Sequence, residues 1–476
     1  MWPRSFPLVL FAGALLFAVA GRGQTLAPES LPDLRIPDFR FPETEATLTR
    51  WVTEAGRGIT TETREAAGAN LLRHGWGLWT ALTAEGLQVV EGQRLRVFET
   101  WQTVDELSPA AAGKAVSSIE ARPVRRSTLG SLEQLQRPWA RAQLDEEPPA
   151  ESQIDRIAGF TKFDPTAAAH IATQRLLETA TLEALLVGGA QGITPFPATA
   201  IAVKPVFQII RGADLVDGRY YALKAWSGPP ATPQAYPPSA WPGAVWIDVR
   251  GGGADAGEVE LPHVADGGAR TAATTYPLDT LIHYRLSALD AAALNAVKPA
   301  SEASAGDVAI LVAMHVSSRE TARWTWQTYW WTPAPEAPPE PSSPRIASLR
   351  PPQLRGAPRH YAMALAYTML APSEPYVGGA NDAPVAYVYN PYVEARFAAT
   401  DLPDSMPGLD PAGRPAANNT GVQSNCMSCH IQATYNPRRL GTAPRFAGAR
   451  YVDLGAAAFV GTLQTDFLWA LPRHAK

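Results

Sequence analysis

Short apolar runs separated by Gly, Pro and Asp dominate the hydrophobic pattern of the second half of the chain. Residues 200–210 (AIAVKPVFQII) and 220–226 (YYALKAW) are predicted to form one pair of strands, and residues 309–316 and 324–331 a second pair. These runs are rich in Val, Ile, Tyr and Trp, as strands usually are. Shorter runs predict further strands at 281–286, 360–370 and 385–389.

Helical patterns are fewer. Residues 46–72 have a helical pattern, and a second helical segment at about 164–187 begins with a clear start signal. Asp164 can cap the helix and Pro165 fits its first turn, while Gly188 and the glycine after it end it. The combination predicts a β-rich α+β fold with an antiparallel, sandwich-like body and a few helices.

Two stretches interrupt these elements. Residues 104–152 are charged and poorly periodic, which predicts a long loop or insertion. Residues 332–352 contain eight prolines in 21 positions, which is typical of a stiff linker or surface loop. We therefore expect a β-rich body at 21–331 and a separate C-terminal region at 353–476.

The first twenty residues have the pattern of a secretory signal. Arg4 precedes an apolar run of about 14 residues, shorter than the roughly 20 that a membrane-spanning helix needs. Ala18-Val19-Ala20 is a small-residue cleavage site. We expect residues 1–20 to be removed after Ala20, leaving a periplasmic protein with no transmembrane anchor. The formal net charge of −4 gives no indication of a nucleic-acid partner.

The clearest candidate chemistry lies in one short motif. The chain has two cysteines, Cys426 and Cys429, and His430 follows them directly. C-x-x-C-H is the attachment pattern of haem c, in which two thiols add to the haem vinyl groups and the histidine ligates iron. One helical turn at this spacing presents both sulfurs and the imidazole to the same porphyrin edge. The motif predicts one covalently attached haem with His430 as an axial iron ligand.

Three other interpretations of the motif are weaker. A redox-active dithiol would sit in a thioredoxin-like strand and helix context, which the flanking sequence lacks. A zinc site would need a second pair of ligands at similar spacing. A disulfide between Cys426 and Cys429 would leave the adjacent His430 unexplained.

Five motifs carry a resemblance to known proteins: HGWGLW at 74–79, FPATAIAVK at 196–204, HVSSRETARWTWQTYWW at 315–331, YNPYVEA at 389–395 and SNCMSCH at 424–430. The attachment motif within the last of them is similar to that of monohaem c-type cytochromes. Over nearly the whole mature chain, the sequence resembles large exported proteobacterial proteins of the cytochrome c family. That resemblance implies haem binding and electron transfer with a redox partner protein.

The sequence does not decide which residue fills the second axial position of the iron. Small soluble cytochromes c take a Met from after the attachment motif, but no Met follows His430 here, so we do not expect their compact fold. Met363 or His360 is favoured because each is near the haem segment in the chain. A Met would raise the reduction potential relative to a second His. The remaining candidates are Met406, His315, His283 and His74.

Two further features have alternative interpretations. The Trp-rich run at 324–331 predicts either an aromatic core or a wall against the porphyrin. His315 and Glu320 are five positions apart, so on a continuous strand they point to opposite faces, although a tight turn would reunite them for metal or acid–base chemistry.

The favoured function is electron transfer by an exported monohaem protein. One alternative is a haem enzyme of oxidase or peroxidase type, in which the β-rich body builds a pocket over an open iron position. Another is a docking module that carries an electron-transfer haem. The sequence assigns no catalytic residue.

Overall fold

The computed structural model describes residues 28–57, 60–90, 93–108, 157–251, 270–297, 301–367, 388–397, 408–409, 415–416, 426–438 and 454–475. The expected signal segment, most of the expected loop at 104–152, and Met406 lie outside these residues.

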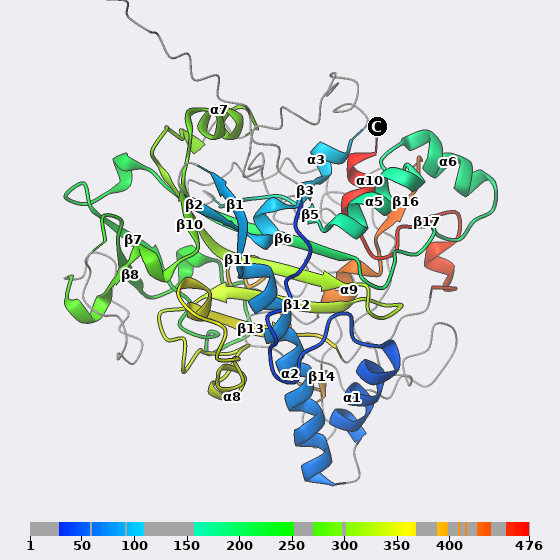
Figure 1. Ribbon diagram of the computed structural model, residues 1–476, viewed down its shortest axis with the longest axis horizontal. Helices are drawn as coiled ribbons and strands as arrows, with labels where there is room; N and C mark the ends of the chain where they lie inside the picture. Colours follow the sequence, from blue (N-terminus) through cyan, green and yellow to red (C-terminus); the bar gives the residue numbers. More distant parts are fainter. Residues whose placement is uncertain are drawn as a thin grey trace, which may run out of the picture.

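An eight-stranded sheet crosses the centre of the protein (Figure 1). Its strand order is β13-β12-β11-β6-β5-β3, with β10 also paired to β11 and β4 also paired to β6. Every one of these pairs is antiparallel. The strands are β3 (Gln102–Thr103), β4 (Ile157–Gly159), β5 (Lys162–Phe163), β6 (Ile201–Ile210), β10 (His283–Arg285), β11 (Val308–Ser318), β12 (Thr325–Trp331) and β13 (Tyr361–Leu365).

β11 is the centre of this sheet. Ten of its eleven residues are buried, and the exception is His315, which is half-buried. Strands buried on both faces have a nearly continuous apolar sequence, as β11 does over VAILVAM. The predicted pairing of this strand with the Trp-rich run is confirmed, since residues 313–318 pair with 325–330.

The other predicted strand pair is wrong. β6 pairs with β11 and not with the strand that follows it in sequence. Eight of the ten residues of β6 are buried, which requires a central position, whereas β7 (Tyr220–Lys224) is mostly half-exposed. β7 instead joins β8 (Ala244–Asp248) and β9 (Thr275–Pro277) in a small sheet at one side of the molecule (Figure 1).

Pro205 is accommodated inside β6 because of where the neighbouring strands end. Proline removes one N–H from a ladder and is rare in central strands. On one edge of β6, residues 202–203 pair with β5 and residues 206–208 pair with β4. Pro205 lies in the interval between them and has no partner in either strand.

Helix α2 (Thr61–Thr83) packs on one face of the sheet. Trp79 stacks on Tyr329 of β12 at a centroid distance of 4.4 Å, and the Tyr329 hydroxyl donates to the Gly75 carbonyl at 2.5 Å. The predicted helical segment at 46–72 is two helices, α1 (Glu45–Arg57) and α2, and α2 continues through HGWGLW. Gly75 and Gly77 weaken the helix locally, but Gly75 allows close approach to Met363 of β13 and Gly77 allows close approach to the Phe39 ring.

The helical segment at 164–187 is confirmed as two helices. In α5 (Pro165–Gln174), Asp164 caps the first turn by accepting from the amides of Thr166 and Ala167. Helix α6 (Thr179–Val187) ends at Gly188, its C-cap residue. The other described α-helices are α3 (Val104–Leu107), α7 (Ala288–Val297), α8 (Pro344–Ser348), α9 (Cys426–His430) and α10 (Ala470–His474).

The proline-rich stretch at 332–352 does not separate two domains. It connects β12 to β13, which pair directly with each other in the same sheet. Ala334, Ala347 and Arg350 within it are buried. Buried residues on both sides of the stretch belong to one hydrophobic core. The stretch is therefore a loop on one body, and the region expected to begin at residue 353 starts inside the central sheet.

Three two-stranded sheets complete the described strands: β1 (Glu85–Val90) with β2 (Gln93–Arg96), β14 (Gly408–Leu409) with β15 (Pro415–Ala416), and β16 (Thr434–Tyr435) with β17 (Leu463–Gln464). The protein is thus β-rich α+β, as predicted, and not a compact helical cytochrome c. Within the described part of the chain, no helix is both long enough and apolar enough to cross a bilayer.

The packing of α2 makes a testable prediction about its glycines. A Cβ at Gly77 would lie 2.0 Å from the Phe39 ring, whereas a Cβ at Gly68 of the same helix would have no atom within 4 Å. We expect Gly77→Ala to lower the free energy of unfolding by about 1–3 kcal/mol through overpacking. Gly68→Ala should raise it by about 0.5–1 kcal/mol, because alanine favours the helix. Denaturant unfolding of both variants measures this, and equal effects of the two substitutions would contradict the packing.

Candidate functional site

The C-x-x-C-H motif forms the single turn of helix α9. Neither Cys426 nor Cys429 is in a disulfide, and both pack against the hydrophobic core. Burial raises the pKa of the Cys426 thiol, and the nearby Glu394 and Cys429 raise it further. The single turn thus carries both sulfurs and the imidazole of His430, as the motif predicts. Because its pKa is raised, Cys426 is in its thiol form at neutral pH.

His430 is held in a defined tautomer. Its Nδ1 lies 2.7 Å from the carbonyl oxygen of Phe467, which can only accept a hydrogen bond, so Nδ1 carries the proton. Burial lowers the pKa of His430 to about 4. The ring is therefore neutral at pH 7 with its lone pair on Nε2. Metal-binding histidines commonly show this arrangement, in which a carbonyl fixes one nitrogen and the other binds the metal.

The carbonyl that orients His430 belongs to a strained turn. Asp466 and Phe467 have φ values of +46° and +66°, in the left-handed region that residues other than glycine seldom adopt. The Asp466 carboxylate holds this turn by accepting from the amide of Phe196 at 3.0 Å and from Nε of Arg319 at 2.9 Å. Such backbone strain persists only where surrounding contacts enforce it, and it is common at functional sites.

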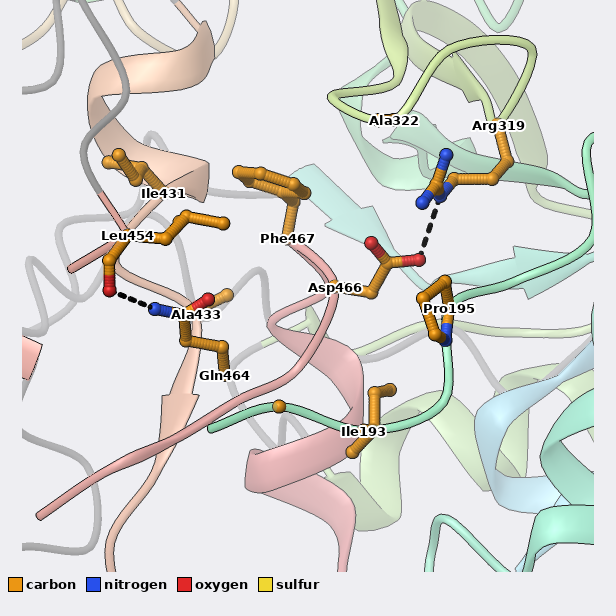
Figure 2. Close-up of a pocket in the computed structure, with 11 residues that line it drawn as sticks. Ile193, Pro195, Arg319, Ala322, Ile431, Ala433, Leu454, Gln464, Asp466 and Phe467 are labelled. Carbon is orange, nitrogen blue, oxygen red and sulfur yellow. Dashed lines mark hydrogen bonds and ion pairs between the residues drawn. The ribbon is translucent and has the colours of Figure 1, made fainter. Parts of the chain in front are cut away.

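A cavity of about 300 Å³ lies beside this turn (Figure 2). The Arg319–Asp466 ion pair is on one side of it, and Ile431 and Phe467 are on the other. Its volume is at the lower limit for a small-molecule pocket. The cavity adjoins the Nδ1 side of His430, because Phe467 lines it and accepts from Nδ1.

The central sheet presents a second group of polar side chains to His430. The His430 ring packs on Trp326 of β12 at a centroid distance of 4.3 Å. Lys204, His315 and Thr328 are directly opposite one another on β6, β11 and β12. Because Trp326 and Thr328 are two apart, this row lies on the same face of the sheet as His430.

His315 has a carboxylate partner on that face. Its Nε2 lies 3.1 Å from Oε1 of Glu394, and the two side chains are 20% and 14% exposed. Besides burial, electrostatic interaction with His315 and Lys204 lowers the pKa of His430, and Glu394 opposes it. Four titratable side chains from separate segments thus lie close enough to interact electrostatically.

A tight turn fixes Glu394. Its backbone amide donates to the Asn390 carbonyl at 2.8 Å, and its Oε2 accepts from the Asn390 amide at 2.5 Å. The Asn390 side chain is fully buried and donates to Thr328 Oγ1 at 2.8 Å and to the Tyr329 carbonyl at 2.9 Å. The turn is therefore anchored to β12, and Glu394 has little freedom to move.

The structure does not bring Met363 or His360 to His430. Met363 pairs with Tyr329, so it lies on the α2 face, and its sulfur is within reach of Gly75. The His360 carbonyl accepts from Thr332 at 2.9 Å, at the opposite end of β12 from Trp326, about 20 Å away at the usual rise of a strand. Proximity in sequence favoured both residues, but strand direction and side-chain alternation separate them from the haem motif.

The other histidine candidates divide between the two faces. His74 lies on the α2 face, with Nδ1 2.9 Å from the Tyr367 hydroxyl and Nε2 3.0 Å from Glu320. Glu320 therefore faces away from His315, as the spacing predicted. His283 pairs with Ile310 in the other half of β11, and its Nδ1 lies 2.9 Å from the Leu281 carbonyl.

The Trp-rich run serves mainly as core. Trp324, Trp330 and Trp331 are fully buried. Trp326 alone of the four tryptophans in this run has a ring contact with His430. The core interpretation is confirmed for these three residues, and a wall against the porphyrin stays a prediction for Trp326.

Sequence reasoning missed three parts of the site: Glu394, Asn390 and the Asp466-Phe467 turn. YNPYVEA at 389–395 is part of the family resemblance, so Glu394 lies within a motif that the sequence analysis singles out. The Phe467 contribution is a main-chain carbonyl, which leaves no side-chain signal in the sequence.

The donors present suit a covalently attached haem. The motif supplies two cysteines outside any disulfide and a neutral imidazole fixed by a carbonyl. Across the ranges that the structure describes, there is no cluster of three or more His, Cys, Asp or Glu side chains that could hold a bare metal ion. Comparison of the chain with protein-family models, curated proteins and solved structures finds no match.

The strained turn predicts an unequal effect of two Asp→Asn substitutions. Asp466 pairs with Arg319 where both side chains are mostly buried, whereas Asp217 pairs with Arg270 and is 66% exposed. We expect Asp466→Asn to lower the free energy of unfolding by about 1–3 kcal/mol, since it leaves a largely buried cation without its partner. Asp217→Asn should cost at most about 1 kcal/mol. Unfolding midpoints in denaturant compare the two, and an equal, small loss would contradict this role of Asp466.

His360 predicts a pH dependence of stability. Burial, with Arg350 and Arg359 nearby, lowers its pKa from 6.5 to about 4. Between these values the unfolded chain binds a proton that the folded chain does not, so stability falls as pH drops from 6.5 toward 4, by up to about 1.4 kcal/mol per pH unit. His360→Gln should flatten the curve over this window. Unfolding of both proteins at pH 7, 6 and 5 measures it, and parallel curves would count against the assignment.

Proposed function

We propose that this protein is an exported electron carrier with one haem, attached covalently through Cys426 and Cys429, and with His430 as an axial iron ligand. It exchanges single electrons with a redox partner protein. The observation that carries the proposal is the hydrogen bond from His430 Nδ1 to the Phe467 carbonyl.

That hydrogen bond leaves Nε2 of His430 as the nitrogen that can bind a metal. A buried neutral imidazole has one donor and one acceptor nitrogen, and both normally find partners. Here the donor is committed to Phe467, and the acceptor Nε2 is the atom that binds iron in a proximal histidine. The strained turn that supplies the carbonyl is enforced by Asp466, so the orientation is built into the fold.

The cysteines support the same proposal. Each thioether forms when a thiol S–H adds across a haem vinyl group, so both cysteines must escape oxidation to a disulfide. Burial raises the pKa of Cys426 and so disfavours the thiolate that attacks a disulfide. The bound haem would supply a one-electron couple, and the protein sets its potential through the axial ligands and the surrounding burial.

A haem enzyme of oxidase or peroxidase type is the second candidate. The observation that favours it is the His315–Glu394 pair, which lies on the same face of the sheet as His430. If the iron had an open position, an imidazole backed by a carboxylate could accept and return a proton there. No residue in the described ranges is assigned to substrate binding.

Covalent attachment is tested by co-expression with haem maturation machinery. We expect the wild-type chain to retain haem stain on a denaturing gel, and the peptide that contains residues 426–430 to carry the mass of haem. The double variant Cys426→Ala/Cys429→Ala should lose both signals. Ser428→Ala, between the two cysteines, should keep both.

Two results would refute the proposal. One is a wild-type chain that acquires no covalent haem under conditions where a known cytochrome c matures. The other is full haem stain in the double cysteine variant.

A further inference from the structure

We infer that His315, oriented by Glu394, is the second axial ligand of the haem iron. The inference rests on the proposed haem attachment and adds the identity of the group opposite His430. Three observations carry it: the face on which His315 lies, the hydrogen bonds that hold Glu394 in place, and the positions of the competing side chains.

The sheet places His315 beside the haem motif. His315 on β11 is directly opposite Thr328 on β12, and Trp326 two residues away contacts the His430 ring at 4.3 Å. His315 is the one residue of β11 that is not buried, with 20% of its side chain exposed. A partly exposed histidine in a strand whose other ten residues are buried marks a place where the strand contacts something other than core.

Glu394 gives His315 the features of a metal ligand. A ligating histidine usually donates its second ring N–H to a carboxylate or carbonyl, which fixes the tautomer and raises the basicity of the ligating nitrogen. Oε1 of Glu394 lies 3.1 Å from Nε2 of His315, within ion-pair distance, and Nε2 is a buried nitrogen without a hydrogen-bond partner. The buried Asn390 turn anchors Glu394 to β12, so the pair is held in place before any cofactor binds.

The competing candidates with described positions lie elsewhere. Met363 and His74 are on the α2 face, and both ring nitrogens of His74 are within hydrogen-bond distance of Tyr367 or Glu320. His360 is at the far end of β12, and His283 lies beside the other half of β11. Of the described candidates, His315 alone combines the face on which His430 packs with a position close to Trp326.

The test uses visible spectra of the matured protein, oxidised, reduced, and reduced with carbon monoxide. We expect wild type to be low-spin and not to bind carbon monoxide, because both axial positions are filled. His315→Ala should become high-spin and bind carbon monoxide, and added imidazole should restore the low-spin spectrum. His360→Ala is the matched control, and its spectra should equal those of wild type.

Two further variants separate ligation from a structural role. His315→Met should remain low-spin with a higher reduction potential, because a Met ligand favours the reduced iron relative to His. Glu394→Gln should remain low-spin but also shift the potential upward, because the imidazole loses a charged partner. If His315 had a purely structural role, His315→Met would leave the potential unchanged.

The inference is overturned if His315→Ala stays low-spin and unreactive toward carbon monoxide. It is also overturned if wild type itself is high-spin and binds carbon monoxide, the result that would favour the haem enzyme. If the proposed function itself is wrong, the wild-type chain shows no haem stain on a denaturing gel, and this result precedes any comparison of spectra.

Discussion

Side-chain alternation along β11 is the constraint on which the site depends. β11 is paired on both edges and buried on both faces, so each of its residues must point to one face or the other. His315 is directed to the face where α9 packs on Trp326, and Met314 and Ser318 are directed to the face covered by α2. A shift of one residue in register would exchange these sets and take His315 away from the haem motif.

Burial then requires that the polar groups on each face be satisfied locally. On the α2 face, His74 lies between Tyr367 and Glu320, and this cluster ties the helix to the sheet. On the other face, the Asn390 turn fixes Glu394 against His315. The two networks differ in one respect. Both ring nitrogens of His74 have hydrogen-bond partners, whereas Nε2 of His315 lies 3.1 Å from Glu394 and has none.

The features that sequence predicted are those set by neighbouring residues. The capped helix at Asp164, the buried strands and the Cys426–His430 turn all depend on local patterns, and the structure contains each of them. The pairing of β6 with β11 was missed because it depends on which strand needs burial on both faces. Met363 was favoured by its distance along the chain, but its side chain points to the face that α2 covers. The role of the Phe467 carbonyl could not be predicted, because main-chain groups leave no signature in the sequence.

The most direct test is a structure of the matured protein with anomalous diffraction measured at the iron absorption edge. We expect one iron peak, bonded to Nε2 of His430 while Nδ1 still donates to the Phe467 carbonyl. Continuous electron density should join the porphyrin to both cysteine sulfurs. A disulfide between Cys426 and Cys429, or an iron bonded to Nδ1 of His430 with the Phe467 hydrogen bond broken, would contradict it.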